Sequence, residues 1–198
     1  MRLPDERYEE IKMAIALTFE DYNVDGLPID VFGLAKKIGV SVVYASQIIK
    51  NNKGKINEFM LFAYPPSYLY YSKEKQKFFV YIDDVGTNKS RQRFSMAHEL
   101  MHIILGHTEQ NERNEAEANF GSQYMLTPTS LILLAPDNWL LEETDFIKFI
   151  FDVSEPVAET TIRYNHNRLY YVSLEEKPYE EIINNQLGTA FNDIISPK

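Results

Sequence analysis

The sequence predicts an α+β fold, with a small, mostly antiparallel β-sheet packed against an amphipathic helix and surrounding helices. Three observations support this prediction. Apolar residues recur at helical spacing near the N-terminus, β-branched and aromatic runs follow, and the helical period returns from Ser90 onward. The order of helices, then strands, then helices is typical of α+β domains.

The first half of the chain is predicted to hold two helices and four strands. One helix is expected from about Asp5 to Tyr22, with Asp5 as its N-cap. A shorter helix follows and ends at Gly39. The next runs are rich in β-branched and aromatic residues and are separated by turn residues, so they predict strands. These runs are 40–44, 59–63, 68–71 and 78–82.

The second half is predicted to be mainly helical. Its first helix carries one apolar stripe, which includes Phe94, Ala97 and Met101 and stops near Gly106. Further helices are expected at 113–125, 131–134, 142–151, 156–164 and 179–185, and a short strand at 169–172. Because no linker divides the chain, we expect a single domain over 1–198, with a helical C-terminal part from about 129.

Composition excludes several classes of protein. The 198 residues include no cysteine, so a disulfide framework, a thiol nucleophile and a cysteine-ligated metal are excluded. The net charge of −9 argues against a protein that binds nucleic acid through its phosphates. The N-terminus lacks the apolar core of a signal peptide, and no apolar run is long enough to cross a bilayer. We therefore expect a cytoplasmic protein that does not contact membranes.

The segment His98-Glu99-Leu100-Met101-His102 predicts a metal site on a helix. Residues four apart on an α-helix differ by about 40° in direction and by about 6 Å along the axis, so His98 and His102 can bind one cation. Glu99 lies beside them and can reach a water molecule at that cation. A zinc hydrolase needs this spacing. The alternative is a pair of partly buried histidines with ordinary hydrogen bonds.

A catalytic zinc usually takes three protein ligands, and the sequence offers two sources for the third. His107 is the nearest histidine. The metzincin pattern, however, would require glycine at position 105 and histidine at position 108, where this chain has Leu105 and Thr108. We interpret His107 as a surface or capping histidine because it follows the helix-ending Gly106. The other source is the next helix, which begins with the acidic residues Glu112, Glu115 and Glu117.

A carboxylate from a second, antiparallel helix would complete the ligand set in the manner of the gluzincins. The alternative is that these glutamates form a solvated, charged face at the start of a helix. Spacing alone does not decide between the two interpretations.

Three linked motifs resemble the ImmA/IrrE family of zinc metallopeptidases. They are Arg93-Phe94-Ser95-Met96-Ala97-His98-Glu99-Leu100-Met101-His102, Glu115-Ala116-Glu117-Ala118-Asn119-Phe120 and Met125-Leu126-Thr127-Pro128. The resemblance implies a zincin-like active-site helix and one zinc ion bound by His98, His102 and Glu115. It also implies that Glu99 is the catalytic glutamate, and Glu117 is the fallback for the third ligand. Three departures, Met101, Gly121 and Thr127, remove no functional group but leave the shape of the pocket open.

The resulting hypothesis is a zinc-dependent endopeptidase in which Glu99 moves the proton of the attacking water. Relatives cleave repressors of phage or mobile-element type, so the resemblance implies such a regulator as the protein substrate. The residues leave open whether zinc or manganese is the working metal, and which of Tyr124, His107 and His166 stabilises the oxyanion. The oligomeric state also stays open.

Two other functions compete with this hypothesis. The chain could be a non-catalytic metal-binding module that sequesters a regulator. Alternatively, the segments 142–151 and 156–164 could form a DNA-reading helix-turn-helix, although Glu155 and Glu159 on the second segment and the acidic chain favour a simple packing hairpin.

Overall fold

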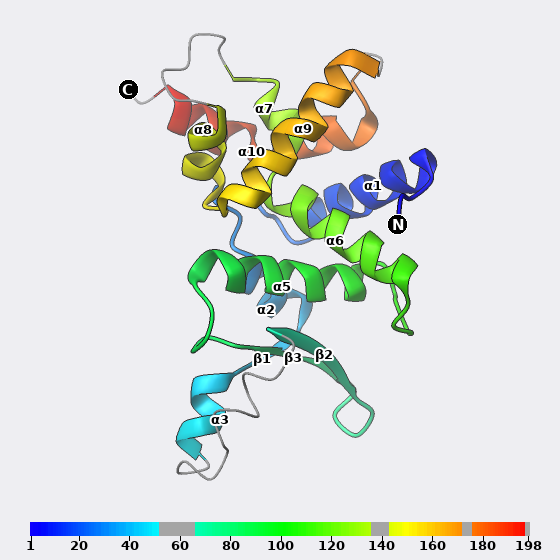
Figure 1. Ribbon diagram of the computed structural model, residues 1–198, viewed down its shortest axis with the longest axis vertical. Helices are drawn as coiled ribbons and strands as arrows, with labels where there is room; N and C mark the ends of the chain where they lie inside the picture. Colours follow the sequence, from blue (N-terminus) through cyan, green and yellow to red (C-terminus); the bar gives the residue numbers. More distant parts are fainter. Residues whose placement is uncertain (52–65, 136–142, 172–175, 197–198) are drawn as a thin grey trace.

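The computed structural model describes residues 1–51, 66–135, 143–171 and 176–196 (Figure 1). In chain order its elements are α1 (Asp5–Asp21), α2 (Val31–Ile38), β1 (Ser41–Tyr44), α3 (Ala45–Asn51), β2 (Ser67–Ser72), β3 (Lys77–Ile82), α5 (Lys89–Ile104), α6 (Glu112–Leu126), α7 (Thr129–Ile132), α8 (Glu143–Phe151), α9 (Glu155–Tyr171) and α10 (Pro178–Ile195).

The sheet has three strands in the order β1-β3-β2 within the described ranges. β2 and β3 form an antiparallel hairpin in which Leu69 faces Val80, whereas β1 runs parallel to β3 and places Val42 beside Val80. The α+β class is confirmed, but the sheet is mixed, because β1 pairs in parallel with β3 whereas β2 pairs with it antiparallel. The strand expected at 59–63 lies outside the described residues.

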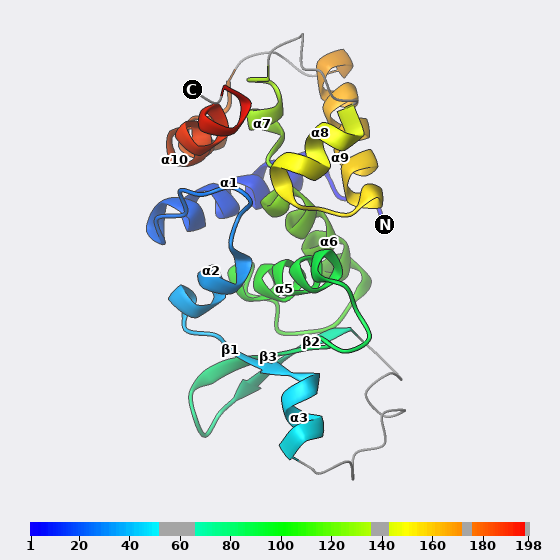
Figure 2. The ribbon, with the colours of Figure 1, turned by 90° about the vertical axis from the view of Figure 1, so that its left-hand side faces the viewer.

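Helix α5 lies between the sheet and α6 (Figures 1 and 2). Its sequence predicts one apolar stripe, yet Met96, Ala97, Leu100 and Met101 are all fully buried. The buried surface is wider than a stripe because the helix is covered by β2 and β3 on one side and by α6 on another. This sandwiched helix carries both histidines of the predicted metal site.

Side-chain caps and glycines set the helix ends around this layer. Asn88 accepts a hydrogen bond from the Arg91 N–H at the start of α5, and Asn111 accepts one from the Asn114 N–H at the start of α6. Gly39 ends α2 in the left-handed conformation, as its sequence position predicts. Asp5 is the first residue of α1 and not its cap, because Pro4 takes the N-cap position.

Helices α1, α7, α8, α9 and α10 form a second layer, in which α1 and α9 contact α6. α1 contacts α6 and α10, and its buried residues Ile11, Ile15 and Phe19 join Leu187 and Phe191 of α10 in the core. α8 and α9 contact each other as a hairpin. This layer holds α6 from the side opposite α5, so it fixes the helix that carries Glu115.

Three further expectations need correction. α3 was not expected, and it follows β1 directly. The strand expected at 169–172 is wrong, because α9 continues through Tyr171 without a glycine or proline to end it. The last helix begins at Pro178 and runs to Ile195, well past residue 185. Within the described residues, no helix has the length and apolar character needed to cross a bilayer.

Candidate metal centre

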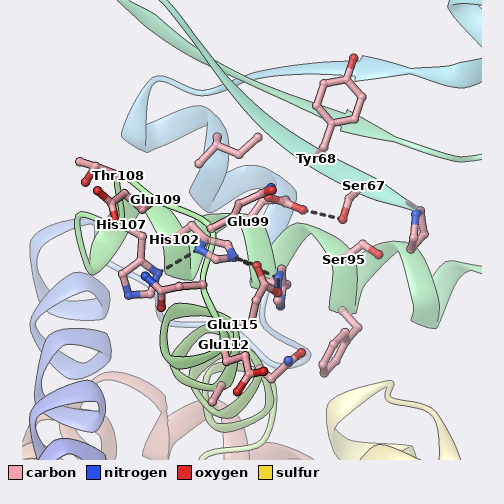
Figure 3. Close-up of a pocket in the computed structure, with 18 of the residues that line it drawn as sticks. Ser67, Tyr68, Ser95, Glu99, His102, His107, Thr108, Glu109, Glu112 and Glu115 are labelled. Carbon is pink, nitrogen blue, oxygen red and sulfur yellow. Dashed lines mark hydrogen bonds and ion pairs between the residues drawn. The ribbon is translucent and has the colours of Figure 1, made fainter. Parts of the chain in front are cut away.

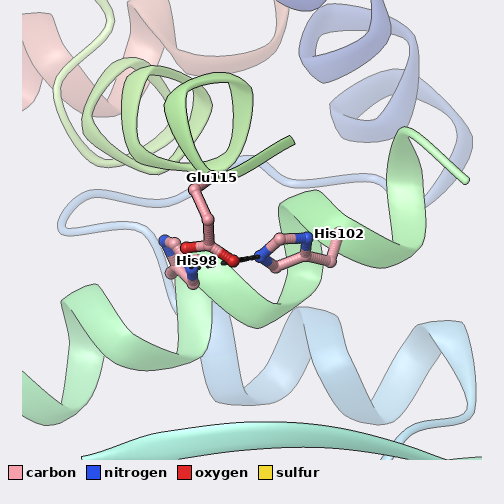
Figure 4. Close-up of side chains that lie close together, drawn as sticks. All are labelled: His98, His102 and Glu115. Carbon is pink, nitrogen blue, oxygen red and sulfur yellow. Dashed lines mark hydrogen bonds and ion pairs between the residues drawn. The ribbon is translucent and has the colours of Figure 1, made fainter. Parts of the chain in front are cut away.

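Two helices bring three predicted ligands together. His98 and His102 lie one turn apart on α5, and Glu115 lies in the first turn of α6. Figure 4 shows the Glu115 carboxylate pointing at both imidazoles. The three residues form a group whose ligand atoms all lie within 4.8 Å of one another. The helix that follows the histidines therefore doubles back over them, as the gluzincin interpretation requires.

The distances between these donor atoms fit a tetrahedral zinc ion. The Nε2 atoms of His98 and His102 are 3.1 Å apart. Oε2 of Glu115 lies 3.4 Å from His98 Nε2, and the other carboxylate oxygen, Oε1, lies 3.5 Å from His102 Nε2. Ligands at zinc bond lengths of about 2.0–2.1 Å in tetrahedral geometry would be separated by about 3.3–3.4 Å. The donor set, two nitrogens and a carboxylate, is also one that zinc accepts.

Burial keeps both histidines in the form that binds metals. It lowers the pKa of His98, and it lowers the pKa of His102 to about 4, where the neighbouring His98 and His107 rings add to the effect. Both imidazoles are therefore neutral near pH 7 and have a lone pair for a cation. The neighbouring Asn119 and Glu115 of α6 oppose this shift at His98, but burial outweighs them.

Glu99 lies in the same cleft but outside the ligand group. Its side chain is buried, with a relative exposure of 6% for the residue. Burial raises the pKa of Glu99 to about 7, although the Ser67 hydroxyl donates a hydrogen bond of 2.7 Å to its Oε1 and opposes the shift. Ser67 is the first residue of β2, so the sheet holds this carboxyl from the side opposite α6 (Figure 3). A carboxyl with a pKa near neutrality can both accept and return a proton.

His107 is not the surface histidine that its position predicts. Its side chain is only 6% exposed, and its Nδ1 lies 2.9 Å from Nδ1 of His102 (Figure 3). It also does not join the ligand group, because its Nε2 lies 3.1 Å from Oε2 of Glu117. It therefore lies behind a predicted ligand, on the side away from Glu115.

Glu117, the fallback third ligand, faces away from the ligand group. Arg7 of α1 donates a hydrogen bond of 2.5 Å to its Oε2, and Arg113 donates one of 2.9 Å to its Oε1. Burial opposes ionisation of this carboxyl, but its hydrogen bonds outweigh burial and lower the pKa of Glu117 to about 2. Glu115 thus faces Nε2 of His102, whereas Glu117 faces His107 on the other side of the His102 ring.

The model of the IrrE N-terminal-like domain family matches residues 35–163, well over half of the chain. The chain belongs to this peptidase family. The matched segment includes the sheet, α5, α6 and every residue of the ligand group. Among curated proteins, none matches the chain.

The site of this IrrE N-terminal-like domain opens into a cleft of about 950 Å³. His98, Glu99 and His102 line it from α5, Glu115 from α6, and residues 66–69 from the start of β2. The cleft has one wall from a strand and another from a helix, and its volume leaves room for a stretch of peptide. Membership of a peptidase family implies protein substrates.

The three expected oxyanion donors do not gather in this cleft. Tyr124 is buried in the helical layer, where its ring packs against that of Tyr179, and it does not line the cleft. His166, on α9, is half exposed and pairs with Glu143 at 3.2 Å. His107 lines the cleft, but both of its ring nitrogens already face the partners described above.

Proposed function

We propose that this chain is a zinc-dependent endopeptidase whose metal is held by His98, His102 and Glu115, with Glu99 as its general base and acid. The observation that carries the proposal is the ligand group itself, because ligand atoms of two imidazoles and a carboxylate lie within 4.8 Å of one another beside a buried glutamate. The family gives independent support, since its members are peptidases.

A zinc ion bound at this group would supply a Lewis acid that polarises the scissile carbonyl and lowers the pKa of a water molecule. The chain's own residues do the rest. His98 and His102 are already neutral, so no proton has to leave them before the metal binds. Three protein ligands leave a fourth position free for water or substrate.

Glu99 has the properties that proton transfer requires. The residue follows His98 on α5, so its carboxyl lies near the ligand group without belonging to it. It accepts a proton from the attacking water and passes it to the departing amine, so the peptide bond is hydrolysed without net change in the carboxyl. The hydrogen bond from Ser67 leaves one oxygen of Glu99 held and the other available.

We infer that the substrate is a regulator of repressor type, which the family resemblance implies. Residues 66–69 of the β2 region line the same cleft as the ligand group. A peptide that lies along them in an extended conformation, as in the addition of a strand to the edge of a sheet, would pass the ligand group. We place this reaction in the cytoplasm.

The test is cleavage of a cognate repressor by the purified, zinc-loaded chain. Wild type should give discrete fragments that a chelator suppresses. Glu99→Gln should abolish cleavage while zinc and repressor still bind, because the amide keeps the size of the side chain but cannot take a proton. Glu20→Gln, an exposed change on α1, is the matched control and should cleave as wild type does.

The Glu99→Gln variant also separates the enzyme from the sequestering module, if relief of repression by the cognate repressor is measured beside cleavage. If Glu99→Gln relieves repression as well as wild type does, binding is the function and the peptidase proposal fails. If wild type produces no zinc-dependent fragment from the repressor or from a peptide library, the proposal fails as well.

A further inference from the structure

A line of hydrogen-bonding groups leads away from the ligand group behind His102. His102 Nδ1 lies 2.9 Å from His107 Nδ1, and His107 Nε2 lies 3.1 Å from Oε2 of Glu117. The rings of His102 and His107 meet edge to face, with an interplanar angle of 71°. The ligand group does not include His107 or Glu117, so their contacts behind His102 require their own explanation.

The backbone places His107 in this position. Gly106 adopts a left-handed conformation with φ of 67° at the end of α5. The His107 N–H then donates to the His102 carbonyl at 2.9 Å, and the Gly106 N–H donates to the Ile103 carbonyl at 3.1 Å. This pair of bonds is the Schellman arrangement, which folds the second residue after the C-cap back onto the last turn of the helix. The same turn therefore fixes both the main chain and the ring of His107 against His102.

The far end of the line is a buried, charge-balanced carboxylate. The side chain of Glu117 is 2% exposed. Arg7 and Arg113 each bind one of its oxygens. A buried carboxylate needs such partners to remain ionised. Arg7 comes from α1, outside the segment that matches the family, so the first helix of this chain contributes to the line.

One arrangement of protons satisfies all of these contacts when His102 presents Nε2 to a cation. The proton of the neutral His102 ring must then be on Nδ1, so His102 donates to Nδ1 of His107. His107 must keep Nδ1 bare, and its own proton is therefore on Nε2. From there it donates to Glu117, whose ionised carboxylate can only accept.

We propose that His107 is a positioning residue for His102, and that Glu117 in turn holds His107. These hydrogen bonds fix the tautomer and the direction of the His102 ring. Because they end at the ionised Glu117, they also make Nε2 of His102 a more basic ligand. Partners of this kind behind a metal-binding histidine typically change metal affinity by about 10- to 100-fold. The inference rests on the proposed metal site, but it concerns residues outside the ligand group.

Zinc affinity of the purified full chain, measured by competition with a chromophoric chelator, tests the role of His107. His107→Phe keeps a ring of similar shape but has no acceptor, and zinc should bind about 10- to 100-fold more weakly. His107→Asn places an oxygen near the position of Nδ1, so it should recover part of this loss. His166→Phe, which changes a half-exposed histidine on α9, is the matched control and should bind zinc as wild type does.

Ring nitrogen NMR of the zinc-loaded wild type supplies a second readout that needs no substitution at all. His102 should carry its proton on Nδ1 and His107 on Nε2. A His107 ring with a protonated Nδ1 would overturn the inference even if His107→Phe failed to fold. Equal zinc affinity of folded His107→Phe and wild type would also overturn it and leave the metal site intact. Failure of wild type to bind zinc would instead overturn the proposed function, and this inference with it.

Discussion

The side chain of Met101 occupies the space that a Cβ atom at Gly121 would need. An added Cβ would lie 2.6 Å from Met101 Cε, 2.9 Å from Cγ and 3.0 Å from Sδ. Met101 and Gly121 are two of the three positions at which the sequence departs from the motifs that it resembles. The structure shows that the two departures compensate, because the larger residue on α5 faces the smaller one on α6.

Gly121→Ala should therefore have opposite effects in two backgrounds. In wild type, the added methyl contacts Met101 as far back as Cγ, and overpacking of this kind costs about 1–3 kcal/mol. The gain of about 1 kcal/mol from helix propensity offsets only part of it. In Met101→Ala the clash is gone and Gly121→Ala should stabilise the chain. Urea unfolding of the four proteins measures this, and equal effects in both backgrounds would rule out the pairing.

Arg93 should prove important for stability although it lies outside the ligand group. It donates hydrogen bonds to the carbonyls of Ile29 at 3.0 Å and Phe151 at 3.1 Å, so it joins α5 to the segment before α2 and to the end of α8. In Arg93→Ala the Ile29 carbonyl would keep the Val31 N–H as a donor at 3.1 Å, whereas the Phe151 carbonyl would lose its Arg93 donor. An unsatisfied buried group costs about 1–3 kcal/mol, so we expect a loss of roughly 2 kcal/mol in the free energy of unfolding.

Arg91→Ala provides the matched control for that measurement, because Arg91 is an exposed arginine two residues away. A loss below about 0.5 kcal/mol is typical of exposed positions and is expected for the control. The structural role of Arg93 would be contradicted if the two substitutions changed the unfolding free energy equally.

Glu99 should titrate near neutrality in the metal-free protein. Burial raises its pKa to about 7. The folded state therefore holds a proton that an unfolded chain releases near pH 4.5, and the stability gained from this proton is lost as the pH rises from about 4.5 to about 7. Carbon NMR of the Glu99 carboxyl reports the pKa directly.

Ser67→Ala provides a second check on Glu99, because loss of the hydroxyl donor should raise the pKa of the carboxyl further. Zinc should lower it, since a nearby cation favours the carboxylate. A Glu99 that titrates near pH 4.5 in the metal-free protein would contradict the buried environment on which its catalytic role depends.

The local geometry of the metal centre could be predicted from sequence because it follows from helix periodicity. His98 and His102 share a face for that reason alone, and the apolar residues around them predict a buried helix. The choice between Glu115 and Glu117 could not be made from spacing. It depends on where α6 lies relative to α5 and on Arg7, which is more than a hundred residues away in sequence from Glu117.

The buried position of His107 has a local signal in the sequence. Gly106 predicts the end of α5, and the Schellman arrangement at such a glycine folds the next residue back onto the last helical turn.

Other features have no local signal in the sequence. The parallel pairing of β1 with β3 depends on tertiary packing. Residues 169–171 have the β propensity of a strand, yet they continue α9 because no helix-ending residue precedes them.

Glu115 should be required for metal binding, whereas its neighbour Glu112 should not. Both glutamates lie in the first turn of α6, but only Glu115 belongs to the described ligand group. Glu115→Ala should weaken zinc binding by more than the 10- to 100-fold change typical of an outer partner, because it removes a ligand. Glu112→Ala should bind zinc as wild type does. Equal loss in both variants would indicate a diffuse acidic surface and not a ligand.

The zinc content of the purified protein, measured by elemental analysis beside that of His98→Ala, tests the central claim most directly. His98 contributes one of three donors whose spacing matches a tetrahedral ion, so its removal should leave no stable site. The structure predicts about one zinc ion per wild-type chain and almost none in the folded variant. Zinc missing from wild type, or retained equally by His98→Ala, would contradict the metal centre.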